Sequence, residues 1–311
     1  MAIRPIEEGY VYRYLSLTDQ DKSDLEKFAE LESIKNSVFA NDYLNHIGQD
    51  KDHRLVYLLK NKKLYRSLPS GFNDPYDCLV EFDTENLVDR NLLNWFRQYH
   101  INSSFSKEEL IELIEKVKNL DPYLDLSTSE IANQEHREAI ITILKSVLQR
   151  IVYDSRVICF SKSESNLPNN ILMWAHYADK HSGYCLTFDV KKLKGSNSLV
   201  GLYEVDYHPN ELRPLLQLTP EEFKNLEFVK KILLPKSVHW KYEKEVRLIY
   251  VNTKEYFDFQ AESLTGIVFG AKMPPKYQAG FRFLVETLNE LGHVSFSNAE
   301  LDRKKYAVNI S

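Results

Sequence analysis

Apolar positions recur with helical spacing early in the chain and alternate with polar ones where strands are expected. Residues 10–15 (YVYRYL) alternate in this way and predict a strand, whereas apolar residues every three or four positions predict a helix over 24–39. A short helix over 53–62 and a strand over 64–67 follow. The next segment, 69–75 (PSGFNDP), is rich in turn-forming residues and predicts a loop.

The stretch 86–151 differs, because its periodicity predicts helices only, over 87–99, 107–120 and 131–151. None of the candidate site residues lies in this stretch. We interpret it as a helical insertion within a single domain of residues 1–311. It either covers a cleft or is plain helical packing, and base rates favour plain packing.

The second half of the chain is dominated by short apolar runs. Its pattern predicts strands over 156–161, 183–190, 199–207, 245–251, 264–269 and 293–297, and helices over 170–179, 221–234 and 274–291. Strands therefore occur in both halves without regular alternation with helices. This order predicts an α+β fold with a mixed or antiparallel sheet and not a doubly wound one.

Charge and cysteine usage narrow the class of protein. The 311 residues carry a net charge of -5, so the chain lacks the overall positive charge typical of nucleic-acid-binding proteins. Cys78, Cys159 and Cys185 stand far apart with no CxxC pair, which is typical of free thiols in a reducing compartment. No apolar run approaches the roughly 20 residues that span a bilayer, and the first residues lack a signal-peptide core. We expect a cytoplasmic protein without membrane association, of undetermined oligomeric state.

Two arginine-aromatic segments and one rigid turn are candidate binding elements. Arg13 stands between two tyrosines on the first strand, and Tyr65 and Ser67 flank a second arginine. An arginine beside aromatics suits a phosphate or carboxylate ligand, although a lone arginine more often pairs with a carboxylate. Asn73 and Asp74 precede a proline, so they either build a structural turn or present a polar group to a cleft.

A run of aromatic residues marks the helix over 170–179. On a helix Trp174, Tyr177 and His181 share one face, and His176 lies beside it. Aromatic residues at this spacing more often belong to a core than to a cofactor site, but each of these also carries a polar group that needs a partner. The spacing of the two histidines and Cys185 fits no common zinc site.

Acidic and basic residues alternate at the start of the strand over 245–251. If the strand extends back to Glu243, then Glu243, Glu245 and Arg247 point to one face. Such a group forms either an ion-pair network or an active site in which a glutamate stabilises positive charge or acts as a general base. The chain lacks a GxGxxG, Walker, GxSxG, HExxH or kinase motif.

Taken together, these segments resemble a bacterial family catalogued as domain of unknown function 2971. The resemblance spans about residues 10–290. It is carried by the motifs VYRYLS, KLYRSLPSGFNDPYDC, ICFSKSESNLPNNILMWAHYADKHSGYCLTFDV, KSVHWKYEKEVRLIY and IVFGAKM. Similar proteins are often encoded among anti-phage and abortive-infection genes, so the resemblance implies a toxin-like effector.

The element order also resembles the ADP-ribosyltransferase fold, with a basic residue on an early strand and a glutamate on a late one. That resemblance implies NAD as substrate and a carboxylate, Glu245 or Glu243, that stabilises the oxocarbenium-like cation formed when the nicotinamide bond breaks. Arg13 would contact the pyrophosphate or ribose. The other implied NAD-binding residues are Tyr65, Ser67 (for which Ser161 competes), Asn73, Trp174, His176, Tyr177 and Arg247. The acceptor, a protein, a nucleic acid or water, is not predicted.

Two other functions fit the same residues. A metal-dependent nuclease would use carboxylates as magnesium ligands, with Asp74, Asp77, Glu243 and Glu245 converging on one ion. A non-catalytic sensor would bind a phage protein or a nucleotide in a pocket lined by Trp174, Tyr177 and Trp240. Convergence of the carboxylates would favour the nuclease, and an aromatic pocket without a reaction would favour the sensor.

Overall fold

Two compact units make up the chain in the computed structural model. The first contains Met1–Ser67, Arg156–Val205 and His239–Ser311, and the second contains Leu68–Ser155 and Asp206–Val238. The structure describes residues 6–79, 138, 141–142, 153, 155–193, 201–209, 227–251 and 254–311. Almost all of the predicted insertion over 86–151 lies outside these residues. The insertion, its three helices and the single domain over 1–311 therefore stay predictions.

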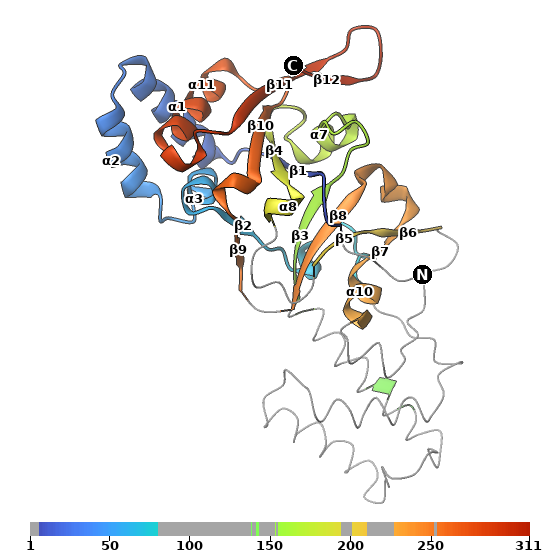
Figure 1. Ribbon diagram of the computed structural model, residues 1–311. Coiled ribbons are helices and arrows are strands. Elements are labelled where there is room, and N and C mark those ends of the chain that lie inside the picture. The colour runs from blue at the N-terminus through green and yellow to red at the C-terminus, as the bar shows by residue number, and fades with distance from the viewer. Residues whose placement is uncertain are drawn as a thin grey trace, which may run out of the picture. The chain divides into compact units, whose positions relative to one another are not determined.

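A mixed eight-stranded sheet forms the centre of the first unit and confirms the predicted α+β class (Figure 1). Its strands are β1 (Tyr10–Leu15), β3 (Ser155–Ser161), β4 (Tyr184–Asp189), β5 (Gly201–Glu204), β8 (Glu245–Val251), β10 (Leu264–Phe269), β11 (Ser295–Leu301) and β12 (Val308–Ile310). They lie in the order β12-β11-β10-β4-β1-β3-β8-β5. Strands β10 and β11 run parallel, whereas β1 is antiparallel to both of its neighbours.

Alternation along β1 assigns the two faces of this sheet. Val11 and Leu15 belong to the large core, which also contains Phe160 and Phe188. Tyr12 and Tyr14 belong to a smaller core on the opposite face. Because successive side chains of a strand point to opposite faces, Arg13 lies on the large-core face with Val11 and Leu15. Both faces of the sheet are therefore covered.

Among the described residues, four of the longer helices pack on the large-core face, and one short helix packs on the other (Figure 1). The four are α1 (Asp19–Ser33), α2 (Ser37–Ile47), α3 (Arg54–Asn61) and α11 (Pro275–Thr287), and the fifth is α7 (Ile171–Tyr177). Helix α1 begins with a capping box of Thr18 and Asp21, in which each side chain binds the other residue's backbone N–H. Helix α1 packs closely on α11, where Gly280 meets the carbonyl of Leu25. No helix in the described part of the chain is long and apolar enough to cross a membrane.

The predicted helix over 24–39 is wrong, because two helices occupy this region. Helix α1 ends at Ser33, Lys35 adopts a left-handed φ of 50°, and Asn36 caps α2 by accepting a hydrogen bond from the N–H of Phe39. Asparagine at this position offers the new helix an acceptor for its orphan N–H groups. The chain can therefore turn here without losing hydrogen bonds.

Shorter elements complete the described chain. In the first unit β2 (Lys63–Tyr65) pairs antiparallel with β9 (Tyr256–Asp258), and the other short segments are α8 (Val190–Leu193) and three 3-10 helices, η2 (Val238–Glu243), η3 (Ala261–Ser263) and η4 (Asn289–Leu291). In the second unit η1 (Pro69–Gly71) and α10 (Glu227–Leu233) accompany a parallel pair, β6 (Asp206–His208) and β7 (Pro235–Ser237). The strand predicted over 199–207 is in fact two strands, β5 and β6, which separate at Val205.

Candidate functional site

The predicted catalytic and cofactor-binding residues do not gather in one place. Arg13 lies on the large-core face of the sheet. Val246 and Leu248 belong to that core as well, so Glu245 and Arg247, which alternate with them along β8, lie on the opposite face. Among the described residues, the structure therefore does not bring the two β8 residues into contact with Arg13.

Glu245 and Arg247 form a buried ion pair within β8. Arg247 Nε donates to Glu245 Oε1 over 2.8 Å and Nη2 donates to Oε2 over 3.1 Å. Burial, followed by the Glu245 carboxylate, raises the pKa of the neighbouring Cys159 thiol well above its ordinary value. The thiol thus stays protonated. These contacts form the ion pair that one interpretation of this charged strand expects, and the active-site interpretation stays a prediction.

Glu243 is not part of the strand, contrary to the prediction that it shares a face with Glu245. It ends the 3-10 helix η2, and Lys244 follows it with a left-handed φ of 45°. The Glu243 side chain is buried and accepts a short hydrogen bond from the Tyr177 hydroxyl, and its carbonyl accepts one from Ser161 Oγ over 2.5 Å. Glu243 and Tyr177 are therefore brought together, as two members of the predicted site.

Helix α7 places the remaining aromatic residues. Trp174 is completely buried, its indole N–H donates to the carbonyl of Pro168 over 2.6 Å, and its ring packs edge-on against Tyr14 at 5.2 Å. His176 is exposed, 6.0 Å from the ring of Tyr242. His181 is not on the helix, because α7 ends at Tyr177 and residues 179–181 all have positive φ. Trp174 is thus a residue of the smaller core, as aromatic residues at this helical spacing more often are.

Ser67 belongs to the first unit and Asn73 to the second. Ser67 pairs through its backbone with Val157, next to β3. Asn73 belongs to the second unit, where Asp74 accepts a hydrogen bond from the N–H of Tyr76 and so builds the predicted turn. Asp77 interacts with Lys236 in the same unit. No group of three or more His, Cys, Asp or Glu that could hold a metal ion occurs among the residues that the structure describes.

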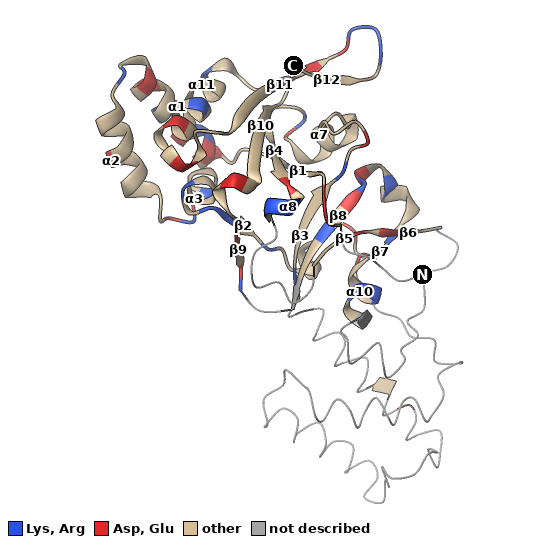
Figure 2. Cartoon of the chain, viewed as in Figure 1, with Lys and Arg blue, Asp and Glu red and all other residues tan. Residues whose placement is uncertain are grey.

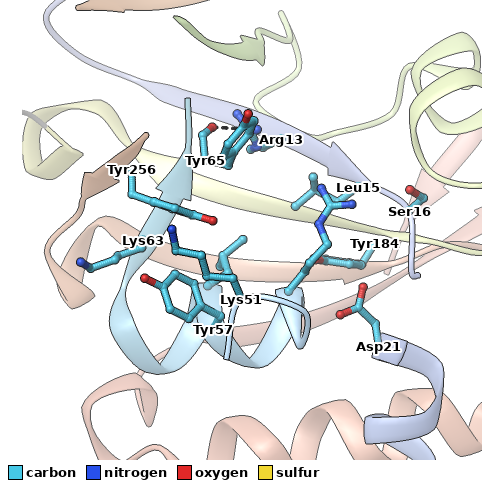
Figure 3. A pocket seen from close by; sticks show the side chains of 12 residues that line it. Arg13, Leu15, Ser16, Asp21, Lys51, Tyr57, Lys63, Tyr65, Tyr184 and Tyr256 are labelled. Carbon is cyan, nitrogen blue, oxygen red and sulfur yellow. Dashed lines mark hydrogen bonds between the residues drawn. The ribbon is translucent and has the colours of Figure 1, made fainter. Parts of the chain in front are cut away.

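A cavity of about 260 Å³ opens on the large-core side of the first unit (Figure 3). Its walls come from β1, the start of α1, helix α3, and the β2–β9 pair. Basic and tyrosine side chains make up most of the lining, which consists of Arg13, Leu15, Ser16, Asp21, Lys51, Arg54, Tyr57, Leu58, Lys63, Tyr65, Tyr184 and Tyr256. Arg13 and Tyr65 are the two predicted site residues that the structure brings together here.

The two arginines of this cavity have no carboxylate partner among the described residues. Arg13 is half-buried and donates only two long hydrogen bonds, to the carbonyls of Cys159 (3.3 Å) and Tyr65 (3.4 Å). Burial lowers the pKa of the Arg13 guanidinium, and the nearby charge of Arg54 lowers it further. A guanidinium nevertheless stays protonated in a protein. Two positive guanidinium groups therefore line one cavity, and some of their N–H groups are available to a ligand.

The other charges of the cavity are already paired. Lys51 binds Glu255 at 3.0 Å and Lys63 binds Asp258 at 3.5 Å. Asp21 accepts hydrogen bonds from the N–H groups of Thr18 and Leu55, at the starts of α1 and α3. Its negative charge is thus offset by two helix N-termini. Figure 2 shows the resulting group of basic residues around α3 and β2.

Sequence patterns missed much of this cavity. Arg54, Tyr57 and Lys51 lie in or next to a segment that was interpreted only as a short amphipathic helix, and Tyr256 lies in a strand that was not predicted. The available signal was the pair Lys63 and Tyr65, which repeats the basic-aromatic pattern of β1 two residues apart.

Comparison with known proteins gives one match. Residues 173–248 match a family model described as protein of unknown function (DUF2971). No curated protein and no solved structure matches the chain. The matched segment contains the buried Tyr177–Glu243 and Glu245–Arg247 pairs, and it also contains Tyr184, which lines the cavity.

Proposed function

We propose that the first unit of the chain binds a nucleotide by the phosphate in the Arg13 cavity. The family model that residues 173–248 match has a description that assigns no function. NAD, through its ADP half, is the first candidate. The observation that carries the proposal is the pair of arginines, Arg13 and Arg54, which line one cavity and form no ion pair with a carboxylate among the described residues.

This arrangement of two arginines favours a phosphate over a neutral ligand. Two neighbouring guanidinium groups repel each other, and a phosphate between them removes the repulsion while it accepts their hydrogen bonds in the planar geometry that arginine offers. Arg13 would also lose only weak hydrogen bonds when it binds a phosphate, since its present bonds to two carbonyls are long.

The size of the cavity favours one nucleotide and not a whole dinucleotide. Pockets for drug-sized ligands usually enclose about 300–1,000 Å³, whereas this cavity encloses about 260 Å³. One phosphate and one ribose-base unit fit such a volume. Bound NAD would therefore place its nicotinamide half outside this cavity.

ADP-ribosyl transfer from such a bound NAD stays a proposal, as do an anti-phage role and a cytoplasmic location. The reaction needs a carboxylate beside the nicotinamide ribose. Within the described residues, Glu243 and Glu245 lie away from the cavity, and Asp21, which does line it, holds two helix N-termini. This geometry supports a binding module more than an enzyme, and the described residues offer the nuclease no cluster of metal ligands.

Calorimetric titration with NAD, ADP-ribose and AMP tests the binding. We expect all three to bind, and Arg13→Ala to weaken each by roughly 30-fold or more, because charge-assisted hydrogen bonds to the phosphate are lost. The matched control is Arg303→Ala, an exposed arginine outside the cavity, which should bind like the unchanged protein. Absence of binding, or equal weakening by both substitutions, overturns the proposal.

Release of nicotinamide, measured in the same samples, tests the transferase reaction separately. If Glu245 stabilises the developing cation, Glu245→Gln should abolish the release and leave NAD affinity nearly unchanged. Binding of NAD without release in the unchanged protein would support the sensor and count against the transferase.

A further inference from the structure

Three tyrosines stand together on one side of the same cavity. Tyr57 comes from α3, Tyr65 from β2 and Tyr256 from β9. The ring of Tyr256 lies 5.3 Å from that of Tyr57 and 5.7 Å from that of Tyr65, in tilted and edge-on arrangements. Figure 3 shows all three on one side of the pocket, with Leu15 and Tyr184 on the other.

The pairing of β2 with β9 fixes this group. Tyr65 and Tyr256 are direct partners in the antiparallel register, so their rings lie on the same face of the strand pair. Lys51 adds a cation 5.0 Å from the Tyr256 ring and is itself held by Glu255. The rings are therefore held in place before any ligand arrives.

The same rings remain open to solvent and to a ligand. Tyr65 is 42% exposed, and Tyr57 and Tyr256 are half-buried. Within the described residues none of the three hydroxyls takes part in a hydrogen bond. Tyrosines that serve only as core normally bury the ring and pair the hydroxyl. An open, preorganised aromatic surface suits a flat ring that stacks on it.

Tyr65 also joins this surface to the arginines, because its carbonyl accepts a hydrogen bond from Arg13 Nη2. The residue that offers a ring face, Tyr65, is therefore the direct neighbour of Arg13, which would hold the phosphate. In a nucleoside monophosphate, the phosphate and the base are likewise separated by a single ribose.

We propose that Tyr65, with Tyr57 and Tyr256, is the base-binding side of the cavity, so that it selects a nucleoside 5′-phosphate over a sugar phosphate. This inference rests on the proposed phosphate binding at Arg13 and adds the part of the ligand that is recognised. The base stacks on the tyrosine ring faces, and such stacking does not depend on which base the nucleotide carries.

Calorimetric titration of the full chain with AMP, ribose 5-phosphate and inorganic phosphate tests it. We expect AMP to bind roughly tenfold or more tighter than ribose 5-phosphate, since stacking on one aromatic side chain strengthens binding by about that factor. Tyr65→Leu should weaken AMP binding to the level of ribose 5-phosphate and leave ribose 5-phosphate binding unchanged. Tyr65→Phe keeps the ring and should bind AMP like the unchanged protein.

The outcomes separate the two proposals. Equal affinity for AMP and ribose 5-phosphate, or an AMP affinity that Tyr65→Leu does not change, overturns the base-binding side while phosphate binding at Arg13 stands. Absence of binding by all three ligands overturns both. A purely structural Tyr65 predicts that Tyr65→Leu weakens both ligands equally, which also counts against the inference.

Discussion

One buried carboxylate, Asp24, joins the three N-terminal helices. It is completely buried on α1 and lies 2.8 Å from His53 Nδ1, which precedes α3. It also accepts hydrogen bonds from Gln20 Nε2 (3.0 Å) and from the hydroxyl of Tyr43 on α2 (2.9 Å). Asp24→Asn keeps the size of the side chain but replaces an acceptor oxygen with an amide group that donates. We therefore expect it to destabilise the first unit.

The expected loss follows from the bonds. A hydrogen bond to a charged group contributes about 1.5–3 kcal/mol, and the Asp24 carboxylate accepts such bonds from Gln20, Tyr43 and His53. Asparagine can still accept one of the three bonds, so we expect Asp24→Asn to lower the free energy of unfolding by roughly 3 kcal/mol. Tyr43→Phe leaves the carboxylate with two partners and should cost about 1.5 kcal/mol.

Urea unfolding, followed by tryptophan fluorescence to which the buried Trp174 contributes, measures both losses at constant m value. The two substitutions share one hydrogen bond, so the double variant should cost about 1 kcal/mol less than the sum. The matched control is Asp19→Asn, an exposed acid on the same helix, which should change stability by less than about 0.5 kcal/mol. A loss below roughly 1 kcal/mol for Asp24→Asn, or strict additivity, would refute the argument.

Three further changes test the packing of the first unit. A methyl group at Gly280 would lie 1.9 Å from the Leu25 carbonyl oxygen, so Gly280→Ala should cost about 1–3 kcal/mol in urea unfolding instead of the usual helical gain; an unchanged midpoint would contradict this. Arg247→Met leaves Glu245 without its guanidinium partner and should cost about 3–5 kcal/mol, most of which the double variant Glu245→Gln/Arg247→Met should recover; a double variant as unstable as Arg247→Met would count against the ion pair. Burial raises the pKa of Tyr12 from 10.0 to about 12, so its stabilising contribution is complete below pH 10.0 and is lost as the pH rises through about 12. Tyr12→Phe should therefore reduce the fall in stability over this range, as measured by urea unfolding, and an identical fall in both proteins would disprove the role of Tyr12.

Sequence periodicity found the elements whose apolar face is buried and failed where exposed residues imitate one. The alternation in YVYRYL predicted β1, and Asn170 was one of the two predicted caps of α7, whose first N–H groups its side chain does bind. Ile34 and Val38 continue the helical spacing of α1, yet they are 67% and 69% exposed. The apolar spacing at these two positions does not correspond to a buried helix face, so it hid the break between α1 and α2.

The candidate site depended on information that local patterns do not contain. Alternation along a strand tells which residues share a face, but not which face of the sheet that is. Arg13 and Glu245 were thus both valid candidates in sequence and still lie on opposite faces. Tyr65 and Tyr256 meet only because β2 pairs with β9, and no pattern within either segment indicates that pairing.

The central position of β1 has a consequence for the newly made chain. Residues 10–15 are translated early, but their neighbours in the sheet, β4 and β3, come from residues 155–189. At the usual rates of protein synthesis, the strand waits roughly 10–35 s before both partners exist. During that time a strand of which half the residues are aromatic has both edges unpaired, and such a strand can pair with other chains. We expect this segment, while the ribosome is still working, to be where chaperones bind and where overproduction leads to aggregation.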